Sequence, residues 1–150
     1  MIQKNTLIAI LLVLIAVASS LAYVIAAFNL NISGNQTVQI TSTAKIVRGD
    51  INGTVTGFVI AGDNQSASLI LPTLTHINDT NIIHVWLQNI GSVNETFTAT
   101  ATTSNPTVAT VTYVTSWGTN QVAPGQLVNL NATVIALGNG TALIAIAISG

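Results

Sequence analysis

One stretch, TVQITSTAKIV at residues 37–47, decides the fold class of most of this chain. Apolar or small side chains occupy every second position of it, at Val38, Ile40, Ser42, Ala44 and Ile46. Successive side chains of an extended chain point to opposite faces, so this alternation predicts a β-strand with one buried face. Similar stretches follow at residues 54–62, 66–72, 81–89, 95–103, 107–117, 126–137 and 141–149. Turn-forming residues separate them, which predicts a 7-8-stranded antiparallel β-sandwich.

Two of these stretches carry a more specific expectation. Residues 126–137 should turn one apolar face inward, formed by Val128, Leu130, Ala132, Val134 and Ala136. The last stretch, TALIAIAIS at 141–149, is apolar on both faces, with Leu143, Ala145 and Ala147 on one and Ile144, Ile146 and Ile148 on the other. An antiparallel sheet usually keeps one face in water. We therefore expect the outward face of this strand to be covered by another subunit or by the N-terminal segment.

The N-terminal segment differs from the rest of the chain. Residues 7–28, LIAILLVLIAVASSLAYVIAAF, contain no charge, proline or glycine. As a helix they would span about 33 Å, enough to cross a bilayer, with Lys4 on the cytoplasmic side. The expected fold class is therefore α+β by content and mainly β. Residues 1–30 form a hydrophobic N-terminal α-helix, 31–36 a linker and 37–150 the β-sandwich head.

The spacing of small residues suggests how that helix packs. Ala18, Ala22 and Ala26 recur every four residues and make one small face, which lets apolar helices approach closely. A cleaved signal peptide is the rival interpretation, because Ser20-Leu21-Ala22 resembles a small-x-small cleavage site. The apolar run continues past that site to Phe28, which favours a retained segment.

Composition excludes several classes of function. Charged residues make up 5% of the chain, against about 25% in an ordinary soluble domain, so there is no basic footprint for nucleic acid. The chain has no cysteine, which excludes disulfides and thiolate chemistry. Asn-x-Ser/Thr sequons, in contrast, are abundant: Asn31, Asn35, Asn52, Asn64, Asn78, Asn94, Asn131 and Asn139. Composition alone accounts for about three. We expect an extracellular surface that carries N-linked glycans and no other cofactor.

No arrangement typical of catalysis, cofactor binding or metal binding stands out. His76 and His84 are expected to be packed or rim residues, and GDINGT at 49–54 matches only a fragment of a calcium loop, so it predicts a turn. Lys45, Arg48 and Asp50 are expected to form a surface ion pair of little energetic weight. Trp86 and Trp117 are expected to anchor the core or an interface. The chain is not expected to be an enzyme.

Several segments carry a family resemblance. Three segments, LQNIGSVNETF, VAPGQLVNLNATV and GNGTALIAIAI, resemble the later strands of immunoglobulin-like adhesion domains of archaeal surface proteins, and this resemblance covers about residues 82–150. The whole arrangement, with ASSLAYVIAAF at 18–28, is similar to the archaeal type IV pilin and archaellin superfamily. The resemblance implies an immunoglobulin-like sandwich behind a helix that bundles in a filament core. The chain departs from the family at the expected cleavage site, where Gln3-Lys4 is followed by Asn5 instead of a small residue.

Three functions follow from these patterns. The first is a pilin, the structural subunit of an extracellular type IV-like filament, a homopolymer of identical subunits that serves adhesion or motility. Its precursor is inserted in the membrane before assembly, and its surface meets adhesion targets. The alternative is a membrane-anchored surface adhesin or binding domain. A second alternative is a secreted β-subunit with a cleaved signal that assembles by strand exchange.

Overall fold

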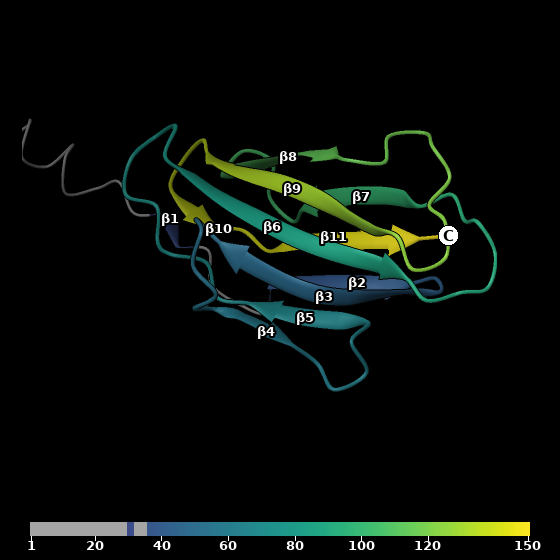
Figure 1. Ribbon diagram of the computed structural model, residues 1–150. Helices are drawn as coiled ribbons and strands as arrows, with labels where there is room; N and C mark the ends of the chain where they lie inside the picture. Colours follow the sequence, from purple (N-terminus) through teal and green to yellow (C-terminus); the bar gives the residue numbers. More distant parts are fainter. Residues whose placement is uncertain (1–29, 32–35) are drawn as a thin grey trace, which may run out of the picture.

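The structure of the protein is a computed structural model that describes residues 30–31 and 36–150, and these residues form strands and no helix (Figure 1). The strands are β1 (Leu30–Asn31), β2 (Gln36–Thr41), β3 (Ala44–Ile51), β4 (Phe58–Ile60), β5 (Ser66–Leu69), β6 (Thr80–Asn89), β7 (Thr98–Thr103), β8 (Ala109–Thr115), β9 (Leu127–Ala136), β10 (Gly140–Thr141) and β11 (Ile144–Ser149). Their positions confirm most of the strands that the alternating pattern predicts.

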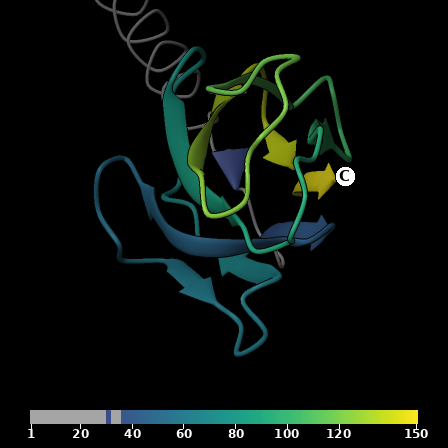
Figure 2. The ribbon, with the colours of Figure 1, turned by 45° about the vertical axis from the view of Figure 1, so that its right-hand side comes forward.

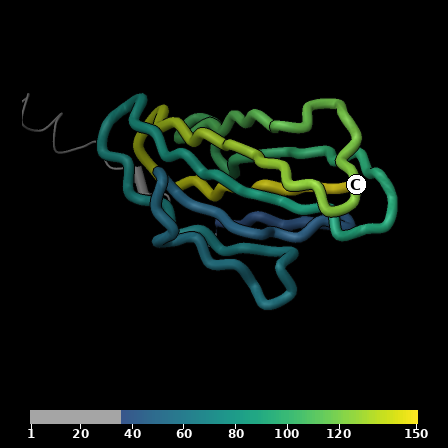
Figure 3. The backbone as a smooth tube through the Cα atoms, viewed as in Figure 1, coloured from purple at the N-terminus to yellow at the C-terminus, as the bar shows by residue number. Residues whose placement is uncertain are grey.

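Two main sheets pack face to face. One has the order β4-β5-β2-β11-β7 and the other the order β3-β6-β9-β8, while β1 and β10 form a short separate pair. The turned view shows the two layers (Figure 2). Figure 1 places β1 at one end of the sandwich and the C-terminal residue at the other, and the tube view shows the path of the chain from Gln36 to that C-terminus (Figure 3). The described chain therefore begins and finishes at opposite ends of the domain.

The expected fold class is wrong for the part of the chain that is described. Its regular structure is all β, not α+β, and it includes no helix with the length and apolar character needed to cross a bilayer. An N-terminal helix is expected over residues 1–30. Residues 1–29 lie outside the described part, and Leu30, the last residue of that range, belongs to strand β1. At the two ends of the linker expected over 31–36, Asn31 belongs to β1 and Gln36 begins β2, and residues 32–35 lie outside the described part.

Strand direction and number differ from the expectation as well. The two main sheets contain nine strands, not seven or eight, and β2 runs parallel to β11, as β1 does to β10. The sandwich is therefore not purely antiparallel. A period of two shows which side chains share a face, but it carries no information on the direction of the neighbouring strand. The longer parallel pair joins β2, near the beginning of the described chain, to β11, its last strand.

The opening stretch forms two strands instead of one. β2 ends at Thr41, the chain turns at Ser42–Thr43, and β3 starts at Ala44 in the opposite sheet. The Ser42 hydroxyl accepts a hydrogen bond from the Ala44 N–H, at 3.1 Å, and holds this corner. The alternation of buried and exposed side chains continues through this corner, because the inner faces of both sheets point into the same core. The sequence pattern therefore does not show where β2 ends and β3 begins.

The core lies between the two sheets. The predicted inner face of β9 is confirmed, since Val128, Leu130, Ala132, Val134 and Ala136 are all buried. On β11 the three isoleucines, Ile144, Ile146 and Ile148, point inward, while Leu143, Ala145 and Ala147 are exposed. The outward face of the last strand is therefore the small one, made mainly of alanine.

An aromatic side chain closes one side of the sandwich. Phe58 of β4, only 9% exposed, lies directly over Gly49 of β3. A Cβ at Gly49 would come within 2.1–2.4 Å of three Phe58 ring atoms. Glycine is therefore required at this position by the close approach of the ring, which seals the gap between the two sheets.

Candidate functional site

No group of three or more histidine, cysteine, aspartate or glutamate side chains comes together in residues 30–31 and 36–150. In this part of the chain, such side chains are therefore not grouped in a way that could hold a metal ion. The polar side chains gather instead on the outer face of the four-stranded sheet. We refer to this cluster as the Trp86 face, and it consists of Lys45, Arg48, Asp50, His84, Trp86, Asn129 and Asn131.

Strand register brings these side chains together. Arg48 of β3 lies opposite Trp86 of β6, which in turn lies opposite Asn129 of β9. In the next row, Asp50 faces His84, and His84 faces Asn131. A register shift between Ile46 and Arg48 marks a bulge in β3. Directly opposed side chains in an antiparallel pair are close enough to interact, so the face is one continuous surface across three strands.

The contacts on this face correct the expected ion pair. The Asp50 carboxylate lies 2.7 Å from Nδ1 of His84, so its partner is a histidine, not Lys45 or Arg48. The Arg48 guanidinium lies 3.9 Å from the centroid of the Trp86 ring, a cation–π arrangement. The His84 ring is 5.7 Å from the Trp86 ring at an angle of 46°. Trp86 is thus the centre of the cluster, with Arg48 and His84 beside it.

A shallow hollow of about 350 Å³ adjoins Trp86, lined by Trp86, Ser116, Leu127, Val128 and Asn129. Two hydrogen bonds between Ser116 and Asn129 shape its wall. The Asn129 N–H donates to the Ser116 hydroxyl at 2.8 Å, and the Ser116 N–H donates to the Asn129 backbone carbonyl at 2.9 Å. The Asn129 carboxamide donates to the Asn131 side chain at 3.4 Å. The hollow therefore combines an aromatic surface with hydroxyl and amide groups.

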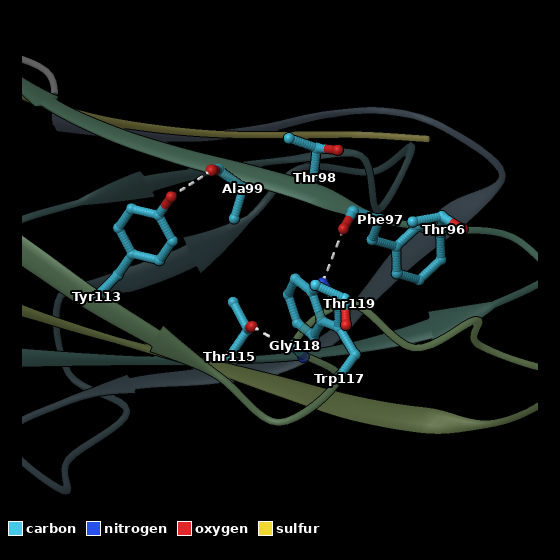
Figure 4. A pocket seen from close by; sticks show the side chains of 9 residues that line it. All are labelled: Thr96, Phe97, Thr98, Ala99, Tyr113, Thr115, Trp117, Gly118 and Thr119. Atoms are coloured by element: carbon cyan, nitrogen blue, oxygen red, sulfur yellow. Dashed lines mark hydrogen bonds between the residues drawn. The ribbon is translucent and has the colours of Figure 1, made fainter.

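A second hollow, of about 310 Å³, opens at the side of the sandwich between β7 and β8 (Figure 4). Its walls include Tyr113, Trp117 and Phe97, with Trp117 at 90° to Phe97. The Tyr113 hydroxyl donates to the Ala99 carbonyl at 2.6 Å, and the Trp117 indole donates to the Phe97 carbonyl at 2.8 Å. Both aromatic side chains therefore donate to backbone carbonyls of the edge strand β7 or of the residue just before it. Trp117 is buried, which confirms its expected role as a core anchor.

The predicted glycosylation sites occupy different environments. Asn52, Asn64, Asn78, Asn94 and Asn139 are exposed in turns and loops, and Asn131 is half-buried in β9 beside His84. Asn31 lies in β1, and Asn35 falls outside the described residues. The small-residue stripe of Ala18, Ala22 and Ala26 also falls outside them.

Turn chemistry explains part of the sequon excess. Asn52, Asn64 and Asn78 all have positive φ, at 54°, 58° and 70°. Asparagine tolerates this left-handed conformation better than most residues. Asn52 and Gly53 form a two-residue turn with both φ values positive, which confirms the turn predicted at GDINGT. The Asn52 side chain also donates to the Asn81 side chain and accepts from the Ile82 N–H, each at 2.7 Å, so it has a structural role of its own.

His76 takes part in a turn closed by Asp79. The Asp79 carboxylate accepts hydrogen bonds from the N–H groups of His76, at 2.8 Å, and Thr75, at 3.0 Å. These bonds lower the pKa of Asp79 from its ordinary value of 3.8. The exposed His76–Asp79 pair adds little stability by itself.

The Trp86 face is the feature that sequence reasoning missed. Lys45, Arg48 and Asp50 are close in sequence, and Trp86 and His84 lie in one predicted strand, but nothing local states that β3 and β6 are neighbours. No known protein-family model matches the chain, and none of the curated proteins compared with it matches either. The function is therefore inferred from the residues and their geometry.

Proposed function

We propose that this chain is the structural subunit of an extracellular filament that assembles through its apolar N-terminal segment, with the β-sandwich on the outside. The observation that carries the proposal is the junction of two unlike parts. Twenty-two residues without charge, 7–28, precede a sandwich in which β2, the second strand, is the central strand of the five-stranded sheet. In a filament, that segment would be buried against its copies and the sandwich would face water.

The way the chain enters the sandwich supports this role. β2 is the central strand of its sheet, and it pairs with β11 on one side and β5 on the other. Tension that reaches β2 along its own axis would load these two ladders in shear, so that many hydrogen bonds resist it together. A subunit that transmits tension from a filament core to its outer domain needs such an attachment.

The two alternatives gain less support. A membrane-anchored adhesin would have the same apolar segment and the same sandwich. It would differ from a filament subunit only in that its apolar segment stays in the membrane and does not pack against copies of itself. Assembly by strand exchange would need an accepting edge or an exchangeable strand. β2 and β11 are each paired on both sides within the sheet, and two outward carbonyls at the β7 edge are occupied by Tyr113 and Trp117.

The test compares filaments on cells that express the wild-type chain and two matched variants. Ala22→Leu enlarges the middle of the small-residue stripe, whereas the control, Ala27→Leu, makes the same change outside the four-residue repeat. We expect Ala22→Leu to reduce filaments by at least about tenfold in electron micrographs, because close packing of apolar segments depends on small side chains. Ala27→Leu should leave them unchanged.

N-terminal sequencing of sheared filaments distinguishes the three functions. A first residue ahead of residue 7 supports the proposal. A first residue beyond Ala22 means that the segment is a discarded signal and contradicts it. Cells that express the protein but carry no filament containing it would also refute the proposal and favour the membrane-anchored alternative.

A further inference from the structure

We infer that the Trp86 face binds an acidic saccharide, a sugar ring that carries a carboxylate. The inference concerns the outer surface of the four-stranded sheet and goes beyond the filament role. It would hold equally for a subunit anchored singly in a membrane.

The first step is the distribution of charge. Of the six charged residues in the described part of the chain, Lys45, Arg48 and Asp50 share this face, whereas Asp63, Asp79 and Glu95 lie outside the strands. The Asp50 carboxylate is engaged by His84 at 2.7 Å. Within residues 30–31 and 36–150, neither Arg48 nor Lys45 then forms an ion pair. Two cations without a carboxylate partner, on a surface otherwise nearly free of charge, favour a ligand with a negative group.

The second step is the aromatic platform. Trp86 is half-buried in the sheet, and the Arg48 guanidinium lies over its ring at 3.9 Å. Stacking on the ring positions the guanidinium and leaves its N–H donors able to form a paired contact with a carboxylate. A sugar ring can pack its C–H groups on the exposed part of the Trp86 indole. Its carboxylate can then reach the guanidinium that is held beside the indole.

The third step is the hollow beside Trp86. Its volume of about 350 Å³ falls in the usual range of about 300–1,000 Å³ for small-molecule sites. Ser116 and Asn129 supply a hydroxyl and a carboxamide there, and Leu127, 52% exposed, supplies an apolar wall. Neutral hydrogen-bonding groups match the hydroxyls of a sugar, and the Arg48 guanidinium beside Trp86 matches its carboxylate.

Other anionic ligands fit less well. A nucleic acid presents a row of phosphates and needs a basic patch, whereas this face has two cations and the whole chain has a net charge of −1. An acidic peptide would need a free sheet edge or an apolar groove to hold its backbone. β6, which carries Trp86, has neighbours on both sides, and β3, the edge strand of this sheet, already donates its Ile46 N–H to the Asn64 carbonyl at 2.7 Å.

The experiment measures binding of two matched probes, tri-galacturonate and neutral tri-galactose, to the full chain in detergent micelles by titration calorimetry. The protein is made in a host without N-glycosylation, so that no glycan on Asn131 competes for the face. We expect the acidic probe to bind at least about tenfold more tightly than the neutral one, because a charge-assisted hydrogen bond is stronger than a neutral one. The difference should shrink as salt is added.

Three variants assign the preference to residues. Arg48→Gln should reduce binding of tri-galacturonate to the level of tri-galactose, while Lys4→Gln removes the same charge ahead of the apolar segment and should change nothing. Trp86→Ala should abolish binding of both probes, and Trp86→Phe should retain part of it. Near-ultraviolet circular dichroism checks that each variant is folded. If the wild type binds neither probe at millimolar concentration, binds both equally, or keeps its acid preference in Arg48→Gln, the inference is wrong.

Discussion

Replacing Gly49 by alanine tests whether the Phe58 ring closes the β3–β4 side of the sandwich. The new methyl carbon would lie 2.1–2.4 Å from three atoms of the ring, far inside van der Waals contact. Phe58 is 9% exposed and has little room to yield, so the ring must leave its site. We therefore expect Gly49→Ala to unseal this side of the core.

The size of the effect follows from the burial of Phe58. Exposing a buried phenylalanine side chain costs about 1.5–3 kcal/mol, and overpacking adds strain of about 1–3 kcal/mol. The two costs do not add in full, because a ring that moves out into water relieves the strain of overpacking. We therefore expect Gly49→Ala to lower the free energy of unfolding by about 2–4 kcal/mol. Phe58→Ala alone should cost about 3 kcal/mol, near the low end for truncating a phenylalanine, since the ring lies at the edge of the core.

The double variant separates a steric clash from a general weakness of the strand. In the Phe58→Ala background the methyl group introduced by Gly49→Ala has no ring to meet, so the second substitution should cost less than about 0.5 kcal/mol. Urea unfolding of the full chain in a mild detergent, followed by tryptophan fluorescence, measures all four proteins. Additive effects of the two substitutions would refute the reasoning, because they would mean that the side chain at position 49 does not act through Phe58.

Three further predictions concern the edge, the outer face and the glycans. Tyr113→Phe removes the hydroxyl that donates to the Ala99 carbonyl. It should lower the free energy of unfolding by about 1 kcal/mol and increase light scattering on concentration, because a strand edge loses its cover; unchanged stability would show that the bond contributes nothing. Ala147→Lys places a charge on the outward face of β11. It should leave the circular dichroism of the chain unchanged but reduce filaments in micrographs, and normal filaments would mean that no subunit covers this face. Mass spectrometry of the native protein should find a glycan on Asn94, and Asn94→Gln should not alter thermal unfolding. Asn52→Gln should destabilise even the unglycosylated protein, because its side chain holds the β3–β4 turn; equal stability of the two variants would contradict this.

The sequence alone determined the local features of this protein. Alternation along 126–137 predicts which side chains of β9 are buried, because the period of an extended chain depends only on successive residues. The turn at Asn52-Gly53 is likewise predictable, since those two residue types adopt positive φ at low cost. The shortage of charge and the excess of sequons are properties of composition, and both are independent of how the chain folds.

The tertiary structure decided how these local features combine. TVQITSTAKIV obeys one alternating pattern, yet Ser42 and Thr43 divide it between two sheets that share a core. The parallel β2–β11 pair joins segments about a hundred residues apart, and register across such a separation is settled by competition among all the strands.

The Trp86 face has the same origin. Arg48 stacks on Trp86, and Asp50 turns to His84, only because β3 and β6 became neighbours with a bulge between Ile46 and Arg48. A shift of one residue in that register would send every one of these side chains to the opposite face of the sheet. The pattern of single residues therefore predicts the faces of the strands, whereas the partners that meet on a face depend on the pairing of strands distant in sequence.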